Sequence, residues 1–170
     1  MKLITPTDGL FTPPSSPSRV HPALCAPSTV VRYDFAADPL TIRMSSSSSH
    51  PYFPSHDPAS TPSLSVLSIR CEIAGHTITI HNRSGITCMD LLVQLHRYFD
   101  QPISSDTWRR VRDSRRDAMK AAYKRRTGRE YNSQSARMKV VDYLLGQSRF
   151  KCVIPEHSNA TESTWLLQTY

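Results

Sequence analysis

The 170-residue sequence contains only five glycines: Gly9, Gly75, Gly85, Gly128 and Gly146. Loops that hold nucleotide phosphates need several glycines close together, because the backbone must turn sharply and approach the phosphate. Glycines this far apart cannot form such a loop. The sequence therefore excludes the P-loop and dinucleotide-binding classes.

Long hydrophobic runs are also absent, and the longest uncharged cluster is short and centred on Leu91-Leu92-Val93. A membrane-spanning helix needs about 20 apolar residues. The first residues, Met1–Pro6, lead into polar residues and not into the apolar core of a signal peptide. We expect an intracellular protein, cytoplasmic or nuclear, that is not secreted and has no membrane partner.

Cysteines are few and scattered, and none forms a Cys-x-x-Cys pair: Cys25, Cys71, Cys88 and Cys152. In a reducing compartment such cysteines behave as small apolar side chains. We expect no disulfide bond.

Proline is concentrated in one part of the chain, with eleven of the 13 prolines before residue 64. Residues 1–28 and 44–63 consist largely of Pro, Ser, Thr and Ala, which offer little apolar surface to offset the entropy of ordering. Both segments are expected to be disordered, as a tail and a linker. Between them, Val31, Tyr33 and Phe35 alternate with polar residues, so 29–43 is expected to be an extended segment that docks on the domain.

Residues 64–170 are predicted to form a single domain that begins with a β-hairpin. Apolar residues alternate before and after Gly75, ending with Ile78 and Ile80. Thr87 then opens a helix, with Asp90 placed for a capping box and Leu91, Leu92, Leu95 and Phe99 on one face.

A second helix is predicted to run without interruption from Ser104 or Ser105 to Gly128, because neither Pro nor Gly intervenes. Met138–Leu145 is predicted as a strand leading into a helical turn that Gly146 closes. Phe150–Ile154 and Trp165–Leu167 are predicted strands, with Trp165 and Leu167 against the apolar face of the hairpin. The predicted fold class is α+β: a small, mostly antiparallel sheet of the hairpin plus C-terminal strands, packed against two or three helices.

Several short motifs resemble an uncharacterised family from basidiomycete fungi that is known only as a domain of unknown function. They are His21-Pro-Ala-Leu24, Tyr33-Asp34, Gly85-Ile-Thr87, Leu91-Leu92, Ala122-Tyr123 with Arg126, Val141-Asp-Tyr-Leu-Leu-Gly146, Phe150 and Trp165-x-Leu167. The resemblance covers residues 20–170 and implies one α+β domain without assigning an activity. Members often carry glycine two residues after the Phe, where this chain has Cys152.

Two patterns that suggest catalysis or metal binding are incomplete. Gly146-Gln-Ser148-Arg-Phe150 lacks the second glycine of a nucleophile elbow. Cys71, His76 and His81 have ligand chemistry, but strand alternation places Cys71 and His81 on different faces, and no fourth ligand is near. We therefore assign no catalytic, cofactor or metal site and expect no small-molecule substrate.

Asp142 is a carboxylate within an apolar run. It is expected to cap the turn Tyr143–Gly146 by accepting backbone N–H groups, rather than to act as a catalytic base.

The strongest surface feature is basic: residues 105–130 contain ten Lys or Arg and four Asp or Glu. Helical spacing predicts a cationic stripe, which Asp113 and Asp117 partly neutralise. The stripe is either a solvated helix face or a contact for an anionic partner. Its candidate residues are Arg109, Arg112, Arg116, Lys120, Arg125 and Arg126.

Four residues that precede proline are candidate sites for a proline-directed kinase: Thr5, Thr12, Ser16 and Thr61. Taken together, the sequence favours a non-catalytic intracellular interaction module with a protein partner. The alternative is a nucleic-acid-binding protein that contacts phosphates through segment 105–127. A hydrolase is the third hypothesis.

Overall fold

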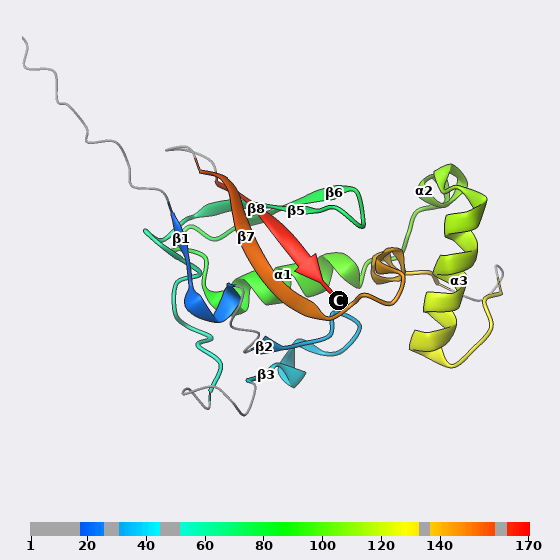
Figure 1. Cartoon of the computed structure of the whole chain (residues 1–170), viewed down its shortest axis with the longest axis horizontal. Coiled ribbons are helices and arrows are strands. Elements are labelled where there is room, and N and C mark those ends of the chain that lie inside the picture. The colour runs from blue at the N-terminus through cyan, green and yellow to red at the C-terminus, as the bar shows by residue number, and fades with distance from the viewer. Residues whose placement is uncertain (1–17, 26–30, 45–51, 133–136, 159–162) are drawn as a thin grey trace, which may run out of the picture.

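A four-stranded sheet forms the body of the molecule in the computed structural model, which describes residues 18–25, 31–44, 52–132, 137–158 and 163–170 (Figure 1). Its strands are β5 (Val66–Cys71), β6 (His76–His81), β7 (Phe150–Ser158) and β8 (Ser163–Thr169), in the order β6-β5-β8-β7. The pairs β5/β6 and β7/β8 are antiparallel, and β5 runs parallel to β8. The predicted α+β class is confirmed.

The predicted hairpin is confirmed as β5 and β6. Leu67 faces Ile80 and Ile69 faces Ile78 in the register, and all four side chains are buried. Gly75 lies in the turn with a φ of +67°, in the left-handed region that glycine adopts without strain. The apolar residues of the alternating pattern therefore lie on one face of the hairpin, and this face is buried in the core.

Parallel pairing of β5 with β8 joins the two halves of the sheet. Ile69 lies beside Trp165, and the indole side chain is 0% exposed. This confirms the prediction that Trp165 packs with the hairpin. The strands themselves extend further than the sequence pattern indicated.

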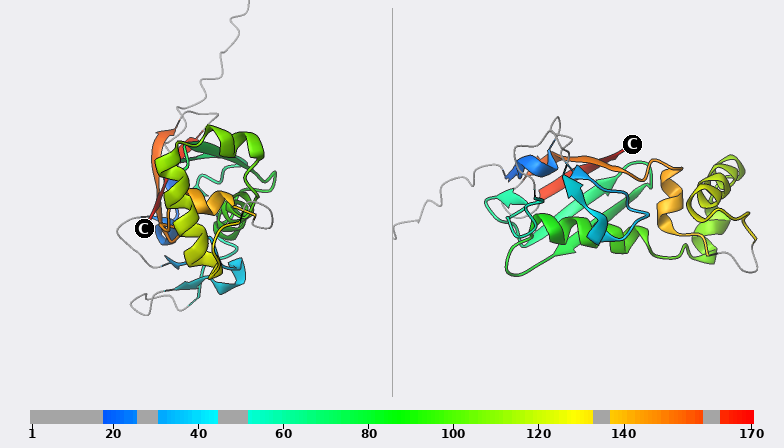
Figure 2. Two further views of the ribbon diagram at one scale, coloured as in Figure 1. Left: turned by 90° about the vertical axis from the view of Figure 1, so that its right-hand side faces the viewer. Right: turned by 90° about the horizontal axis from the view of Figure 1, so that it is seen from below.

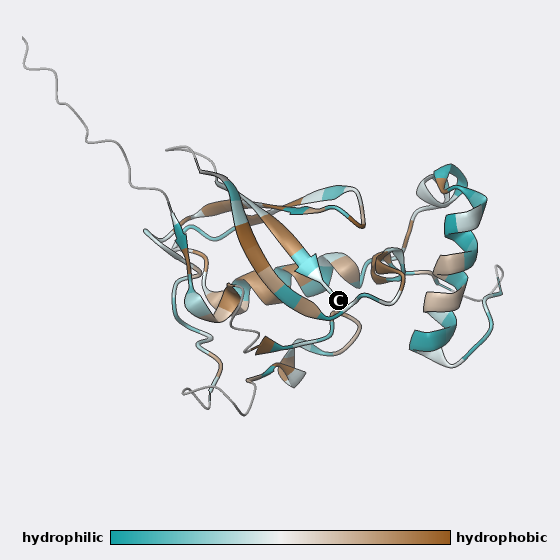
Figure 3. Cartoon of the chain, viewed as in Figure 1, coloured by the Kyte–Doolittle hydropathy of each residue, from teal (hydrophilic) through white to brown (hydrophobic). Residues whose placement is uncertain are grey.

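Helix α1 (Cys88–Phe99) lies along one face of the sheet. Its capping box forms as predicted: Thr87 Oγ1 accepts the Asp90 N–H at 3.1 Å, and Asp90 Oδ2 accepts the Thr87 N–H at 3.0 Å. The predicted apolar face is buried, and it comprises Leu91, Leu92, Leu95 and Phe99. Figure 3 shows the hydrophobic parts of α1 in brown.

Two segments expected to be disordered contribute to the packed body, so that expectation is wrong for residues 18–25 and 52–63. Strand β1 (Arg19–Val20) pairs with β4 (Ser60–Thr61), and a short 3-10 helix, η1 (Pro22–Leu24), buries Leu24. Ala59 is buried, and its N–H donates to Ile86 O at 2.8 Å. A few apolar side chains and backbone hydrogen bonds suffice to order a composition that looks unfavourable. The rest of both segments, apart from Met44, lies outside the described residues.

The segment around Tyr33 forms a small ribbon beside the sheet. Strand β2 (Val31–Arg32) pairs with β3 (Arg43–Met44), and a second 3-10 helix, η2 (Pro39–Thr41), lies between them. Val31, Tyr33 and Phe35 are buried. The Phe150 N–H donates to Tyr33 O at 2.8 Å, which ties the ribbon to the start of β7.

The predicted continuous helix over 105–128 is wrong, because the chain forms α2 (Ser105–Arg110) and α3 (Asp113–Thr127). Val111 between them is extended and buried. Arg116 then occupies the end of α2, donating from Nε to Trp108 O at 3.2 Å and from Nη2 to Arg109 O at 2.6 Å. These tertiary contacts replace the helical hydrogen bonds at the break.

The α2–α3 arm stands at one end of the sheet, with a third 3-10 helix, η3 (Val140–Leu144), between α3 and the body (Figure 2). The sequence predicts a strand that leads into a helical turn over Met138–Leu145; the helical turn forms as η3, but the strand does not. Only an isolated bridge between Lys139 and Pro102 precedes η3. Leu145 and Gly146 follow with positive φ values and turn the chain toward β7.

Replacing Trp165 with Ala should lower the free energy of unfolding by about 3–5 kcal/mol, because a large cavity opens where β5 and β8 meet. Leu166→Ala, on the opposite and half-exposed side of the same strand, is the control and should cost clearly less. Urea denaturation measures both. Equal losses of unfolding free energy in the two variants would show that burial of Trp165 does not stabilise the β5–β8 pairing.

Candidate functional site

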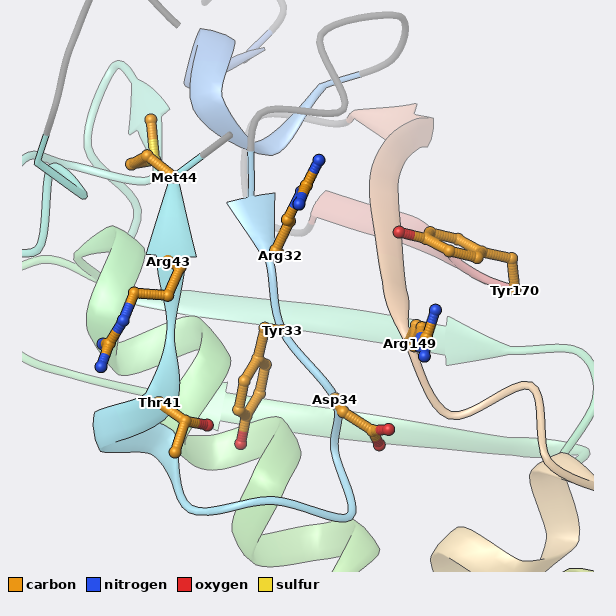
Figure 4. Close-up of a pocket in the computed structure, with 8 residues that line it drawn as sticks. All are labelled: Arg32, Tyr33, Asp34, Thr41, Arg43, Met44, Arg149 and Tyr170. Carbon is orange, nitrogen blue, oxygen red and sulfur yellow. The ribbon is translucent and has the colours of Figure 1, made fainter. Parts of the chain in front are cut away.

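An open groove of about 830 Å³ lies between the β2–β3 ribbon and the ends of β7 and β8 (Figure 4). We call it the arginine groove. Its lining residues are Arg32, Tyr33, Asp34, Thr41, Arg43, Met44, Arg149 and Tyr170.

The fold brings three arginines from separate elements to this groove. Arg32 on β2 is the register partner of Arg43 on β3. Arg149 precedes β7, and its backbone forms an isolated antiparallel β-bridge with the backbone of Asp34. Figure 4 shows the heads of Arg32 and Arg43 turned away from each other, on opposite sides of Tyr33. Like charges placed directly across a strand pair are destabilising. By turning apart, the two guanidinium groups avoid this repulsion although their residues are register partners.

The three arginines are exposed and lack an acidic partner in the described part of the chain. Arg43 donates from Nη1 to Leu40 O at 3.2 Å and to Ile42 O at 3.1 Å, which positions its guanidinium. Asp34 is the one carboxylate side chain among the lining residues, and its Oδ1 accepts the Ala36 N–H at 2.9 Å. The lining side chains therefore carry a net positive charge.

Tyr33 forms the buried floor beneath these charges. Burial raises the pKa of its hydroxyl well above the ordinary value, with further increases from nearby carboxylates. The hydroxyl therefore stays protonated at neutral pH and donates to Ala37 O at 3.3 Å. It serves as a structural donor that holds the loop following β2.

A second cavity of about 340 Å³ continues the groove toward α3, since both cavities share Asp34, Arg149 and Tyr170. It adds Arg125 and Arg126 to the lining. Arg125 donates from Nη2 to Leu145 O at 2.7 Å and lies against Gly146. A Cβ atom at Gly146 would come within 2.5 Å of that nitrogen, so the glycine makes room for the guanidinium.

Arg126 is committed to a buried ion pair with Asp142. Its Nε lies 2.9 Å from Asp142 Oδ1 and its Nη2 lies 2.8 Å from Oδ2, and the Asp142 side chain is only 1% exposed. The hydrogen bond to this carboxylate raises the pKa of Arg126 against the opposing effect of burial. The pair fixes the end of α3 on η3.

Asp142 accepts a backbone N–H group as expected, but the group is not one of those that the prediction named. Its Oδ2 accepts the Lys139 N–H at 2.9 Å, ahead of η3, and not the N–H groups of Tyr143–Gly146. A carboxylate three residues into a helix commonly reaches back to the residue before the first turn. The carboxylate thus orders η3 and neutralises Arg126 together.

Several other residues of the expected stripe contact neighbouring groups within the arm. The exposed pairs Arg109 with Asp106, at 3.1 Å, and Lys120 with Asp117, at 3.0 Å, partly neutralise it. Arg116 turns inward to α2, with its guanidinium carbon 5.7 Å from the Trp108 ring centre and Nη1 2.9 Å from Asp113. Arg112 is exposed at the break between the helices.

One of the four candidate phosphorylation sites lies in the described part of the chain. Thr61 is exposed on β4. Thr5, Thr12 and Ser16 lie outside the described residues.

Neither metal-binding geometry nor a membrane-spanning helix is present in the part of the chain that the structure describes. Cys71 is buried whereas His76 and His81 are exposed, and no three His, Cys, Asp or Glu residues gather there as ligands. None of the helices formed by these residues is long and apolar enough to cross a bilayer. None of the four cysteines, all of which lie in the described ranges, is in a disulfide bond.

The fold and groove define an α+β domain with a basic surface depression. The chain belongs to DUF6699, a family of unknown function, which matches residues 31–163. This confirms the resemblance to a domain of unknown function, whereas the basidiomycete origin stays a prediction. Comparisons with curated proteins and with solved structures found no match. The matched range includes Arg32, Arg43 and Arg149.

Asp142→Ala should lower the free energy of unfolding by about 3–5 kcal/mol, because it leaves the Arg126 guanidinium half-buried without its counterion. Asp117→Ala, which breaks the exposed pair with Lys120, is the control and should have an effect within about 1 kcal/mol. Thermal or urea denaturation measures both. A neutral Asp142→Ala variant would show that the pair does not hold α3 on η3.

Proposed function

We propose that this protein is a non-catalytic intracellular interaction module that binds an acidic segment of a partner protein in the arginine groove. The observation behind this proposal is that Arg32, Arg43 and Arg149, all exposed, line one groove with a single carboxylate side chain in its lining. The described cysteines form no disulfide bond, which is compatible with a reducing compartment.

The chemistry of the groove suits a carboxylate ligand. A guanidinium presents a planar fork of N–H donors that matches the two oxygens of a carboxylate. An acidic side chain bound in the groove would therefore form charged hydrogen bonds with these exposed arginines.

Exposed apolar groups beside the groove favour a protein over a nucleic acid. Leu40, adjacent to the lining residue Thr41, is 84% exposed, and Tyr170 in the groove is 49% exposed. Tyrosine and arginine are enriched in protein interfaces, and exposed apolar side chains give a partner area to bury. An exposed leucine offers no hydrogen bond or charge to a phosphate group, so it would not strengthen binding of a nucleic acid backbone.

Nucleic-acid binding through segment 105–127 stays the alternative. Internal pairing weakens its support, since Arg109, Arg116 and Lys120 each contact an aspartate. Arg110 and Arg112 retain exposed charges on the arm and carry no ion pair among the described residues. They therefore provide a matched control for the groove.

The double substitution Arg32→Gln with Arg149→Gln should weaken binding of a fluorescein-labelled deca-glutamate peptide by about tenfold or more, since each charged hydrogen bond contributes about 1.5–3 kcal/mol. Fluorescence anisotropy at about 0.15 M salt measures the affinity. The control, Arg110→Gln with Arg112→Gln, removes the same charge and should leave affinity nearly unchanged.

Equal weakening by both double variants would mean that net charge alone attracts the peptide, and would contradict the groove assignment. A single-stranded oligonucleotide provides the other comparison. If it binds more tightly than the peptide and loses affinity only in the arm variant, the nucleic-acid alternative replaces the proposal.

A further inference from the structure

The two edges of the main sheet differ in how they are protected. At the β7 edge, Pro155 lies within the strand and Lys151 is exposed, and the register shifts at two places. The beginning of that edge also hydrogen-bonds the backbone of Tyr33. Proline, lysine and irregular register are the features that keep an edge strand from pairing with another chain.

The β6 edge has none of these features. His76–His81 contains no proline, glycine, lysine, arginine or carboxylate, and its register with β5 is regular over six residues. The side chains of Thr77, Thr79 and His81 are exposed. No other backbone among the described residues pairs with its outer side.

The register shows which backbone groups of β6 point outward. The Asn82 N–H donates to Ser65 O at 2.9 Å, so alternate residues from there, including Ile80 and Ile78, exchange hydrogen bonds with β5. The intervening residues Thr77, Thr79 and His81 direct their N–H and C=O groups away from β5. These three alternate residues therefore leave a row of backbone N–H and C=O groups along the outer edge of β6 that can pair with another strand.

We infer that β6 pairs antiparallel with β6 of a second copy of this chain, about a two-fold axis at Thr79. In that register Thr79 faces the same residue of the second copy, and Thr77 faces His81 in both directions. Every outward N–H and C=O of these three residues then has a partner. The result is a continuous eight-stranded sheet across a dimer. This dimer is independent of the proposed binding function.

The strand is complementary to itself in this register, which favours a second copy over a foreign strand. Ile78 faces Ile80 on the side covered by α1, and the polar Thr and His residues face each other on the other side. Arg83, just beyond the strand, meets Gly75, so no like charges face each other directly. The contact is isologous and closes at two chains. Because the arginine groove lies at the opposite, β7 end, both grooves stay open.

Light scattering after size exclusion tests this with the full chain in about 0.3 M salt, which screens repulsion between two chains that each carry a formal charge of +7. The parent should have twice the mass of the 19.2 kDa chain. Thr79→Pro removes an N–H that β5 does not use, and proline is tolerated on the outer side of an edge strand. This variant should be monomeric, and Thr79→Val, which keeps the N–H, should remain a dimer.

Thr79→Lys covers the case in which the proline variant fails to fold, as judged by circular dichroism. It places two ammonium groups at the two-fold axis and should weaken dimerisation at least about tenfold at low salt, with recovery as salt is added. A monomeric parent would overturn the inference. So would a folded Thr79→Pro dimer, or a Thr79→Lys dimer of parental affinity.

Discussion

Parallel pairing of β5 with β8 is the constraint on which the rest of the structure depends. It joins a hairpin near the middle of the chain to one at its end, and Ile69 and Trp165 bury the junction. With β8 fixed, β7 becomes an edge whose first residues hydrogen-bond the segment around Tyr33. That contact places Arg32 and Arg149 at one groove. The position of the basic site therefore follows from a pairing far from its charges.

Local patterns in the sequence predicted the elements that depend on local physics. The alternation around Ile69 predicted the hairpin, and Thr87 with Asp90 predicted the start of α1, because strand parity and helix capping act over a few residues. The break at Val111 has no such mark. It depends on burial of that side chain and on Arg116 reaching back to α2, both of which are tertiary effects. Composition likewise could not show that Leu24 packs into the core.

The candidate site was the least predictable part, because sequence reasoning weighed charge density along the chain. That criterion selected the segment 109–126, where the fold uses Arg116 and Arg126 for internal contacts. The arginines of the groove are single residues far apart in the sequence. One useful pattern was present: burial of Val31 and Tyr33 leaves Arg32 on the outer side of an extended segment. Its partners across the groove are visible only in three dimensions.

Chemical-shift mapping of the full chain during titration with deca-glutamate would test most directly whether the arginine groove is the binding surface. Amide spectra locate the bound peptide residue by residue without altering a charge. We expect the largest shifts at Arg32, Arg43 and Arg149, with smaller changes at Tyr170, and little change at Arg110 and Arg112. Shifts confined to the α2–α3 arm, with the groove unchanged, would contradict the assignment.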